Sequence, residues 1–188
     1  MEKNEQPISF VETPKEICEL MVSFISNSKD SFVLDAGCGK GRFLEVLKNE
    51  GFNKVSGIEM YLPFVRHCKK TFSDYEIING NFLKFPDKET YDVIIGNPPY
   101  AHFNSLPDYI REDVYNLVSS KESDIYYAFI IKAVELLKPG GQLIFITPYS
   151  FNYNTFAYRV RKYLSLLGQI ELIIDLDEAR IFLGENPE

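Results

Sequence analysis

The stretch SFVLDAGCGKGRFLEVLKNEG, residues 31–51, decides the fold class of this chain. Its first part, residues 31–37, is a short apolar run typical of a buried strand. Its last part, residues 41–51, places apolar side chains at helical spacing and ends at Gly51, a residue that commonly closes a helix. A strand followed at once by a helix is half of a βαβ unit, whose strands pair in parallel.

The same alternation continues along the chain. Apolar runs predict further strands at residues 54–60, 75–80, 91–96, 142–148 and 169–176. Apolar residues at helical spacing predict helices at residues 13–26, 62–72, 124–137 and 155–168. Residues 101–123 are the longest stretch without a firm assignment. The pattern predicts an α/β fold, with a doubly wound, mostly parallel sheet and helices on both of its faces.

The composition is that of one globular domain. The 188 residues, 45% of them hydrophobic, suffice for one sizeable core and are too few for two comfortable domains. No apolar run approaches the ~20 residues of a membrane helix, and the N-terminus has no secretory pattern. Cys18, Cys38 and Cys68 are scattered, which indicates reduced thiols in a cytoplasmic protein and argues against a zinc site. The net charge of −7 counts against a nucleic-acid partner.

Ligands of a doubly wound sheet bind beyond the carboxyl ends of its strands. After the first predicted strand, Gly37, Gly39 and Gly41 permit a tight turn and a close approach of backbone to a ligand. Their spacing differs from the dinucleotide-binding G-x-G-x-x-G. Glu59 ends the second strand, where an acidic side chain can accept hydrogen bonds from both hydroxyls of a ribose. The combination predicts a nucleoside-type cofactor, whereas a glycine-rich turn alone is often only structural.

This arrangement resembles the S-adenosylmethionine pocket of class I methyltransferases. The resemblance implies that these residues contact the cofactor: Asp35, Ala36, Gly37, Gly39, Glu59, Met60, Asn81 and Phe82. Asp35, Ala36 and Gly37 would line the methionine part, and Glu59 would bind the ribose. Met60 would lie against the adenine ring, with Asn81 and Phe82 at the edge of that ring. Members of this family usually have an aspartate at position 81. Asn81 can still accept a hydrogen bond through its carbonyl oxygen, but without a charge.

The sequence GNPPYAHF, residues 96–103, follows the fourth predicted strand. Prolines end a strand, but that alone does not require Asn97 or Tyr100. Methylation of an exocyclic amine explains all four residues of NPPY. The Asn97 side-chain oxygen and the Pro98 carbonyl can each accept one N–H of the amine, and Pro98 and Pro99 bring no competing N–H. Tyr100 offers an aromatic face on which a planar base can stack.

Segments on both sides of this motif look like the gamma-class N6-adenine DNA methyltransferases of restriction–modification systems, the TaqI-like enzymes. The similarity rests on VETPKEICELMV before the glycines and DIYYAFIIKAVELLKPGGQLIFITPYSF after NPPY. It implies methyl transfer from S-adenosylmethionine to the amino group of an adenine flipped out of double-stranded DNA. It also implies that Thr13 and Pro14 fold over the methionine end, and that Phe182, in DLDEARIF, stacks on the flipped base opposite Tyr100. From the residues alone, Thr13 is a helix cap that forms a capping box with Glu16.

Such enzymes recognise their target with a separate domain, of which the sequence shows no sign. We therefore expect residues 1–188 to be one catalytic domain, in which residues 1–29 fold over the cofactor site, with target recognition outside this chain in another domain or specificity subunit. The missing region would carry much of the basic surface. The alternatives are a protein-glutamine or RNA amine (adenine or guanine) methyltransferase, which shares the NPPY chemistry, and a non-enzymatic cofactor-binding subunit, which has no need for Asn97.

Overall fold

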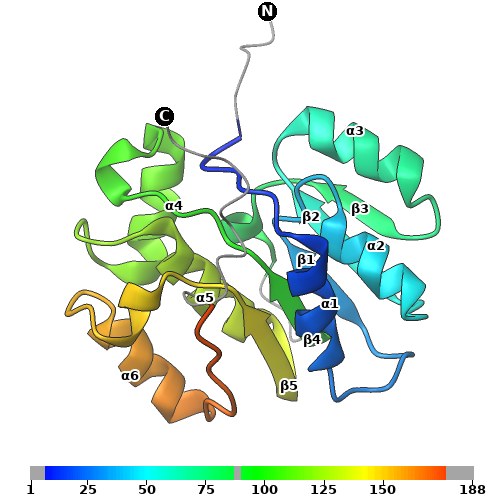
Figure 1. The fold of residues 1–188 in the computed structure, drawn as a ribbon. Coiled ribbons are helices and arrows are strands. Elements are labelled where there is room, and N and C mark those ends of the chain that lie inside the picture. The colour runs from blue at the N-terminus through cyan, green and yellow to red at the C-terminus, as the bar shows by residue number, and fades with distance from the viewer. Residues whose placement is uncertain (1–6, 87–89, 177–188) are drawn as a thin grey trace, which may run out of the picture.

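A parallel β-sheet forms the centre of the molecule (Figure 1). The computed structural model describes residues 7–86 and 90–176. Within these residues the sheet has five strands in the order β3-β2-β1-β4-β5, and every neighbouring pair is parallel. The strands are β1 (Val33–Ala36), β2 (Val55–Glu59), β3 (Glu76–Asn79), β4 (Tyr91–Gly96) and β5 (Leu137–Phe145). The expected doubly wound α/β fold is confirmed.

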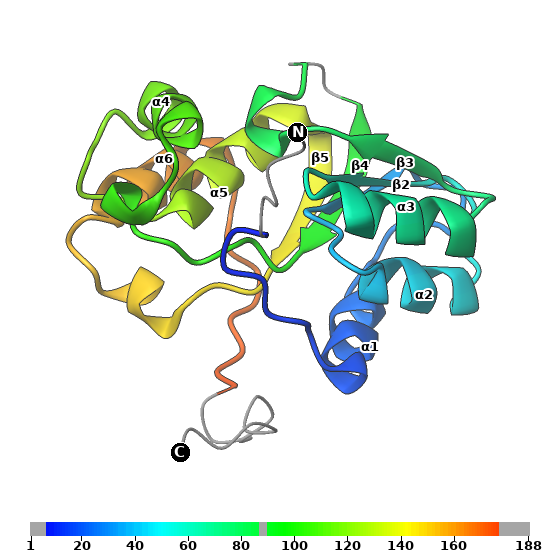
Figure 2. The same cartoon turned by 90° about the horizontal axis from the view of Figure 1, so that it is seen from above.

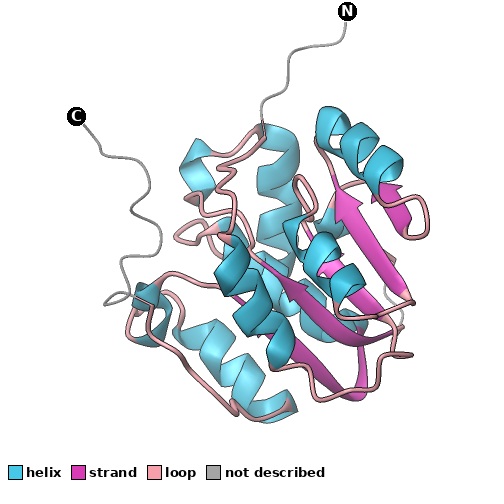
Figure 3. Ribbon diagram, turned by 45° about the vertical axis from the view of Figure 1, so that its right-hand side comes forward, coloured by secondary structure: helices cyan, strands magenta, loops and turns pink. Residues whose placement is uncertain are grey.

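Helices cover both faces of the sheet (Figures 2 and 3). They are α1 (Lys15–Ser23), α2 (Arg42–Asn49), α3 (Leu62–Thr71), α4 (Asp108–Val118), α5 (Ile125–Leu136) and α6 (Tyr158–Leu167). Successive side chains of a strand point to opposite faces. Val33 and Ile95 accordingly pack with α1, α2 and α3, whereas Leu34 and Ile94 pack with α4, α5 and α6. None of the helices in the described ranges is long and apolar enough to span a membrane.

The order of the strands places two sequence motifs side by side. β1 pairs with β4, so the glycine turn after β1 and the NPPY segment after β4 leave the same edge of the sheet. This is the switch point at which a doubly wound sheet binds its ligands. Gly96 allows the end of β4 to lie close to the end of β1, because a Cβ at this position would lie 2.9 Å from the carbonyl oxygen of Ala36.

The strand expected at residues 169–176 is not formed. These residues follow α6 without helix or strand structure, and Ile170, Leu172, Ile173 and Ile174 are 44–61% exposed. A strand is stable only when a neighbour satisfies its backbone N–H and C=O groups. No described strand pairs with this segment, so its apolar pattern alone is not enough to make it a strand.

Residues 101–123 contain more regular structure than their sequence indicated. The short 3-10 turn η2 (Phe103–Ser105) is followed by α4, whose buried residues are Ile110, Val114 and Val118. These three are spaced four apart and form the apolar stripe of an amphipathic helix. Pro107 precedes the helix as its N-cap residue, as expected for a residue whose φ suits the start of a helix.

Candidate active site

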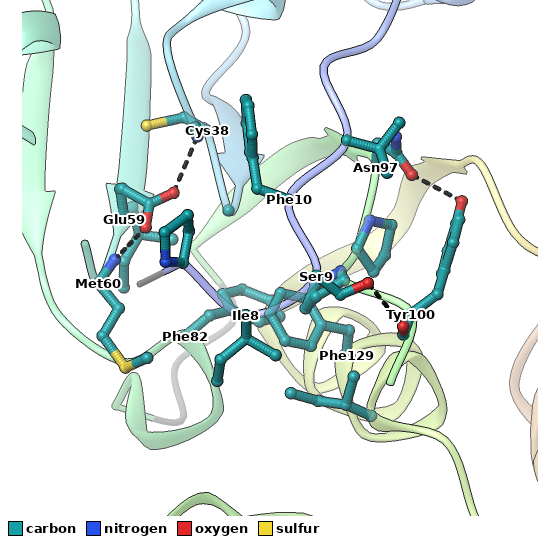
Figure 4. Close-up of a pocket in the computed structure, with 18 of the residues that line it drawn as sticks. Ile8, Ser9, Phe10, Cys38, Glu59, Met60, Phe82, Asn97, Tyr100 and Phe129 are labelled. Carbon is teal, nitrogen blue, oxygen red and sulfur yellow. Dashed lines mark hydrogen bonds between the residues drawn. The ribbon is translucent and has the colours of Figure 1, made fainter. Parts of the chain in front are cut away.

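A single cleft beyond the carboxyl ends of β1, β2, β3 and β4 brings together most of the residues selected from the sequence (Figure 4). Those that line it are Thr13, Gly37, Gly39, Glu59, Met60, Asn81, Phe82, Asn97, Pro98, Pro99 and Tyr100. Pro14, Asp35 and Ala36 do not line it. Phe182 lies outside the described residues.

Asp35 lies in β1, in the interior of the protein, and does not line the cleft. Its side chain is fully buried, and neither carboxylate oxygen has a hydrogen-bond partner among the described residues. Burial raises the pKa of this carboxyl group well above its usual value, and Cys68 and Glu59 add to the shift. A buried carboxyl with a raised pKa favours the neutral form, which avoids the penalty of an unpaired buried charge.

The glycine turn is shaped by contacts that exclude side chains. Gly39 has φ +53°, and a Cβ there would lie 2.6 Å from a ring carbon of Phe10. The N–H groups of Gly37 and Cys38 both donate to the carbonyl of Ile58 at 3.0 Å, which ties the turn to β2. These contacts fix the conformation of the turn where it lines the cleft.

Glu59 joins the ends of β1 and β2. One of its carboxylate oxygens accepts from the N–H of Gly39 at 2.9 Å, and the other accepts from the N–H groups of Met60 at 2.8 Å and Tyr61 at 2.7 Å. Burial raises the pKa of Glu59, while these three hydrogen bonds oppose the shift. The carboxylate is thus held in a fixed orientation at the wall of the cleft.

Asn81, two residues beyond the end of β3, has both ends of its amide engaged. The side-chain oxygen accepts from the N–H of Leu83 at 3.0 Å, which caps the 3-10 turn η1 (Phe82–Lys84). The side-chain nitrogen donates to Asp113 Oδ2, on α4, at 2.8 Å. Asp113 was not selected from the sequence, because the interaction joins residues 32 positions apart.

Asn97 has two hydrogen-bond partners of its own. Its side-chain oxygen accepts from the Tyr100 hydroxyl at 2.6 Å, and its nitrogen donates to Thr13 Oγ1 at 3.2 Å. Burial raises the pKa of Tyr100, so its hydroxyl remains a donor. The Tyr100 ring packs edge-on against Tyr126 with the ring centroids 5.9 Å apart. Asn97, Thr13 and Tyr100 therefore form one connected group at the β4 end of the cleft.

Thr13 does not cap helix α1. Pro14 occupies the N-cap position, the helix begins at Lys15, and no side chain caps it, so the predicted capping box with Glu16 was wrong. The reason is that the Thr13 hydroxyl points to Asn97. The expectation from sequence missed this because residues 84 positions apart meet only in the folded chain.

Residues before Thr13 also line the cleft, in a segment expected to fold over the site, but none of them was singled out from the sequence. Ser9 donates from Oγ to the carbonyl of Tyr100 at 2.7 Å, and Ile8 lies along the cleft beside it (Figure 4). Phe10 packs on Phe64 of α3, with the ring centroids 4.7 Å apart. The segment of residues 7–12 therefore links the two sides of the cleft. Phe10, an aromatic residue in a polar stretch, was the signal that sequence analysis overlooked.

Apolar side chains from the helices complete the walls. Phe129 on α5 packs against Phe82, with the ring centroids 4.9 Å apart, and Ile110 on α4 also lines the cleft. Both belong to apolar helix stripes, which in a sequence indicate core rather than site. The cleft thus has apolar walls with a few fixed polar groups, as small-molecule sites commonly do.

Comparison with known protein families gives one matching family. The model of the Eco57I restriction-modification methylases matches residues 43–182. The type II methyltransferase M.HincII of Haemophilus influenzae is 32% identical over 92% of this chain and 34% of its own length. M.BanIII of Aneurinibacillus aneurinilyticus is 30% identical over 89% of this chain and 33% of its own length. The chain spans about a third of the length of these curated relatives.

Solved structures resemble the fold. A class I S-adenosylmethionine-dependent methyltransferase from Listeria monocytogenes has a TM-score of 0.68 at 19% identity, covering 87% of this chain and 54% of its own. A methyltransferase subunit of a type I restriction-modification system from Streptococcus thermophilus has a TM-score of 0.63 at 20% identity, covering 84% of this chain and 39% of its own. At these identities the likeness is one of fold.

Proposed function

The chain belongs to the Eco57I family of restriction-modification methylases, and from this premise we propose that it is the catalytic part of a DNA adenine-N6 methyltransferase. The observation that carries the proposal is the position of Asn97. Its amide lies with Tyr100 in the same cleft as Glu59 and the glycine turn. An oxygen that can accept a hydrogen bond from an amine and a ring that can stack on a base thus face a site shaped for a nucleoside.

The cofactor is S-adenosylmethionine, and the residues of the cleft fit its chemistry. A carboxylate has about four acceptor positions, and backbone N–H groups use three of those of Glu59. This leaves one for a ribose hydroxyl, where the sequence had suggested that Glu59 accepts from both. Met60 and Phe82 offer apolar surface to the adenine ring, and the glycine turn admits the methionine part. When bound, S-adenosylmethionine supplies the methyl group.

The NPPY residues prepare the acceptor amine. The lone pair of the adenine amine is delocalised into the ring, which makes the nitrogen a poor nucleophile. Asn97 Oδ1 and the Pro98 carbonyl would each accept one N–H and favour a tetrahedral nitrogen. The new C–N bond would form as the bond between the methyl group and the cofactor's sulfur breaks, which leaves a neutral thioether. The nitrogen would become positively charged and would then release one proton to water. No strong base is required.

The Tyr100 hydroxyl now occupies one acceptor position of Asn97 Oδ1. A carbonyl oxygen has two lone pairs, so an amine can share this oxygen with Tyr100 or displace its hydroxyl. The ring would stack on the base, which offsets part of the few kcal/mol lost when a base leaves the duplex. Phe182 remains the proposed partner on the far side of the base. We place target recognition in the part of the relatives' length that this chain does not span.

A product analysis tests the proposal. The chain is incubated with isotopically labelled S-adenosylmethionine and a duplex in which adenines face abasic sites, since an unpaired base costs less to extrude. The DNA is then digested and its nucleosides are identified by mass spectrometry. We expect labelled N6-methyladenine from the wild type and at most traces from Asn97→Ala. Labelled N4-methylcytosine, or transfer only to tRNA or to a peptide glutamine, would contradict the adenine assignment.

A further inference from the structure

The amide of Asn81 is oriented by a carboxylate on a distant helix. Asp113 Oδ2 accepts from the amide nitrogen at 2.8 Å, and Lys84 Nζ lies 3.4 Å from the other oxygen of the same carboxylate. The Asp113 side chain is only 10% exposed. Asp113 itself does not line the cleft, whereas Asn81 does.

We propose that Asp113 is a positioning residue for cofactor selection, which holds the Asn81 carbonyl oxygen toward the amino group of the cofactor's base. This inference rests on the proposed function, since it assumes that a nucleoside cofactor lies in the cleft. Asp113 need not touch the cofactor, because it acts through Asn81.

The location of the base follows from the shape of the cleft. Glu59 marks the ribose, and the glycine turn lies on one side of it. On the other side, Met60 and Phe82 line the cleft with apolar surface suited to a flat ring (Figure 4). Asn81 lines this same end, directly before Phe82. A base between these walls would present its edge to the Asn81 amide.

A carboxylate is the partner that gives an amide a direction. An amide side chain has an accepting oxygen and a donating NH₂ group of almost the same shape. An ionised carboxylate only accepts, so it binds the NH₂ group and leaves the oxygen for other donors. The Leu83 N–H uses one lone pair of this oxygen. The second lone pair is available to the 6-amino group of adenine, whereas a 6-keto group would oppose it.

The test compares two ligands that differ only at this edge of the base, where one has a 6-amino group and the other a 6-keto group with a protonated N1. The dissociation constants of S-adenosylhomocysteine and S-inosylhomocysteine, which carries a 6-keto group, are measured by isothermal titration with the wild-type chain and with Asp113→Asn. An amide at position 113 can turn either end to Asn81. We expect the preference for the adenosine form to fall about fivefold in the variant, equivalent to ~1 kcal/mol.

A charge exchange and a matched control complete the design. The double variant Asn81→Asp/Asp113→Asn moves the carboxylate to position 81. One of its oxygens accepts from Leu83 and faces the base, and the other accepts from the NH₂ group at position 113, so the preference should return. Asp108→Asn makes the same substitution on α4, at a side chain 93% exposed, and should leave the preference unchanged.

Each outcome decides between the two proposals. A folded Asp113→Asn chain with an unchanged preference, or with equal weakening of both ligands, overturns the inference and leaves the proposed function standing. The same holds if the wild type binds both ligands equally, or if the double variant does not recover. Failure of the wild type to bind S-adenosylhomocysteine at all overturns the proposed function and the inference with it.

Discussion

The two asparagines of the cleft, Asn81 after β3 and Asn97 after β4, are held by partners of different chemistry. Asn81 is bound by a backbone N–H, which only donates, and by the Asp113 carboxylate, which only accepts. Asn97 is bound by the hydroxyls of Thr13 and Tyr100, and a hydroxyl can donate or accept. The first amide therefore has one favourable orientation, whereas the second can exchange partners without leaving a polar group unpaired.

This difference matches what the two ends of the cleft have to do. The end near Asn81 would hold a cofactor of constant structure, so a preformed receptor suits it. The end near Asn97 would admit and release a base, so its hydrogen bonds must open and close again. The Glu59 carboxylate, with three backbone N–H donors, belongs to the fixed end. Substitutions at each end of the cleft test this difference between the fixed end and the end that opens and closes.

The largest effect is expected from Asn97→Ala. The substitution removes an acceptor that acts when charge develops on the amine, and the loss of such a group lowers turnover by ~100-fold or more. Cofactor affinity should remain within about twofold, because Asn97 belongs to the other end of the cleft. Methyl-transfer rates and titration with S-adenosylhomocysteine measure the two quantities. Wild-type turnover in the variant would rule out this role for Asn97.

Two substitutions at Tyr100 separate the contribution of the ring from that of the hydroxyl. Tyr100→Ala removes a stacking face worth about 1–3 kcal/mol per base, so kcat/KM for DNA should fall by about 5- to 150-fold. Tyr100→Phe keeps the face and loses only the hydrogen bond to Asn97, so we expect a change of about threefold or less. If the two variants lose equal activity, the hydroxyl rather than the ring is the important group, and the exchange of partners at Asn97 is not supported.

Glu59→Ala tests the fixed end. The variant loses a charged acceptor, whose hydrogen bond contributes about 1.5–3 kcal/mol, so cofactor affinity should fall about tenfold or more. The turn after β1 also loses the acceptor for the Gly39 N–H, so thermal unfolding should be recorded alongside titration. Unchanged affinity in a folded variant would show that the ribose lies elsewhere.

Cofactor affinity should also depend on pH. Burial raises the pKa of Glu59 above its ordinary value of 4.5, so on acidification the carboxylate takes up a proton at a higher pH than an exposed glutamate would. A protonated carboxyl accepts more weakly, and affinity should therefore fall as the pH drops through this raised pKa. The fall in cofactor affinity on acidification should be no larger than the fall caused by Glu59→Ala. The alanine variant itself should show a flatter profile, and an equally steep profile would assign the titration to another group.

The smallest effect is expected at Thr13. Thr13→Val keeps the shape of the side chain and removes the acceptor of the Asn97 NH₂ group. Because the Tyr100 hydroxyl still binds the other end, we expect turnover to fall only about threefold, near the ~0.7 kcal/mol of a weak neutral hydrogen bond. Thr13→Ser retains the hydroxyl and should match the wild type. A loss as large as that of Asn97→Ala would show that the Asn97 amide is fixed as rigidly as that of Asn81.

Local patterns predicted the elements that carry their own signal. Residues 33–51 form the strand, turn and helix that their apolar spacing and glycines indicated. Helix α5 likewise follows its apolar stripe. The prediction failed at residues 169–176, because a strand also needs a neighbour, and no described strand pairs with them. The apolar spacing of α4 was present in the sequence, but the polar residues around it obscured the pattern.

The sequence by itself determined the five strands of the sheet, every helix except α4, the glycine turn, and the residues Glu59, Asn97 and Tyr100 that the sheet brings to one edge. This was possible because parallel strands align their carboxyl ends, whatever the details of packing. Only the tertiary structure decided what orients those residues. Thr13 meets Asn97 and Asp113 meets Asn81 through pairs 84 and 32 residues apart. A hydrogen bond depends on position and direction in space, and neither follows from residue type or from spacing along the chain.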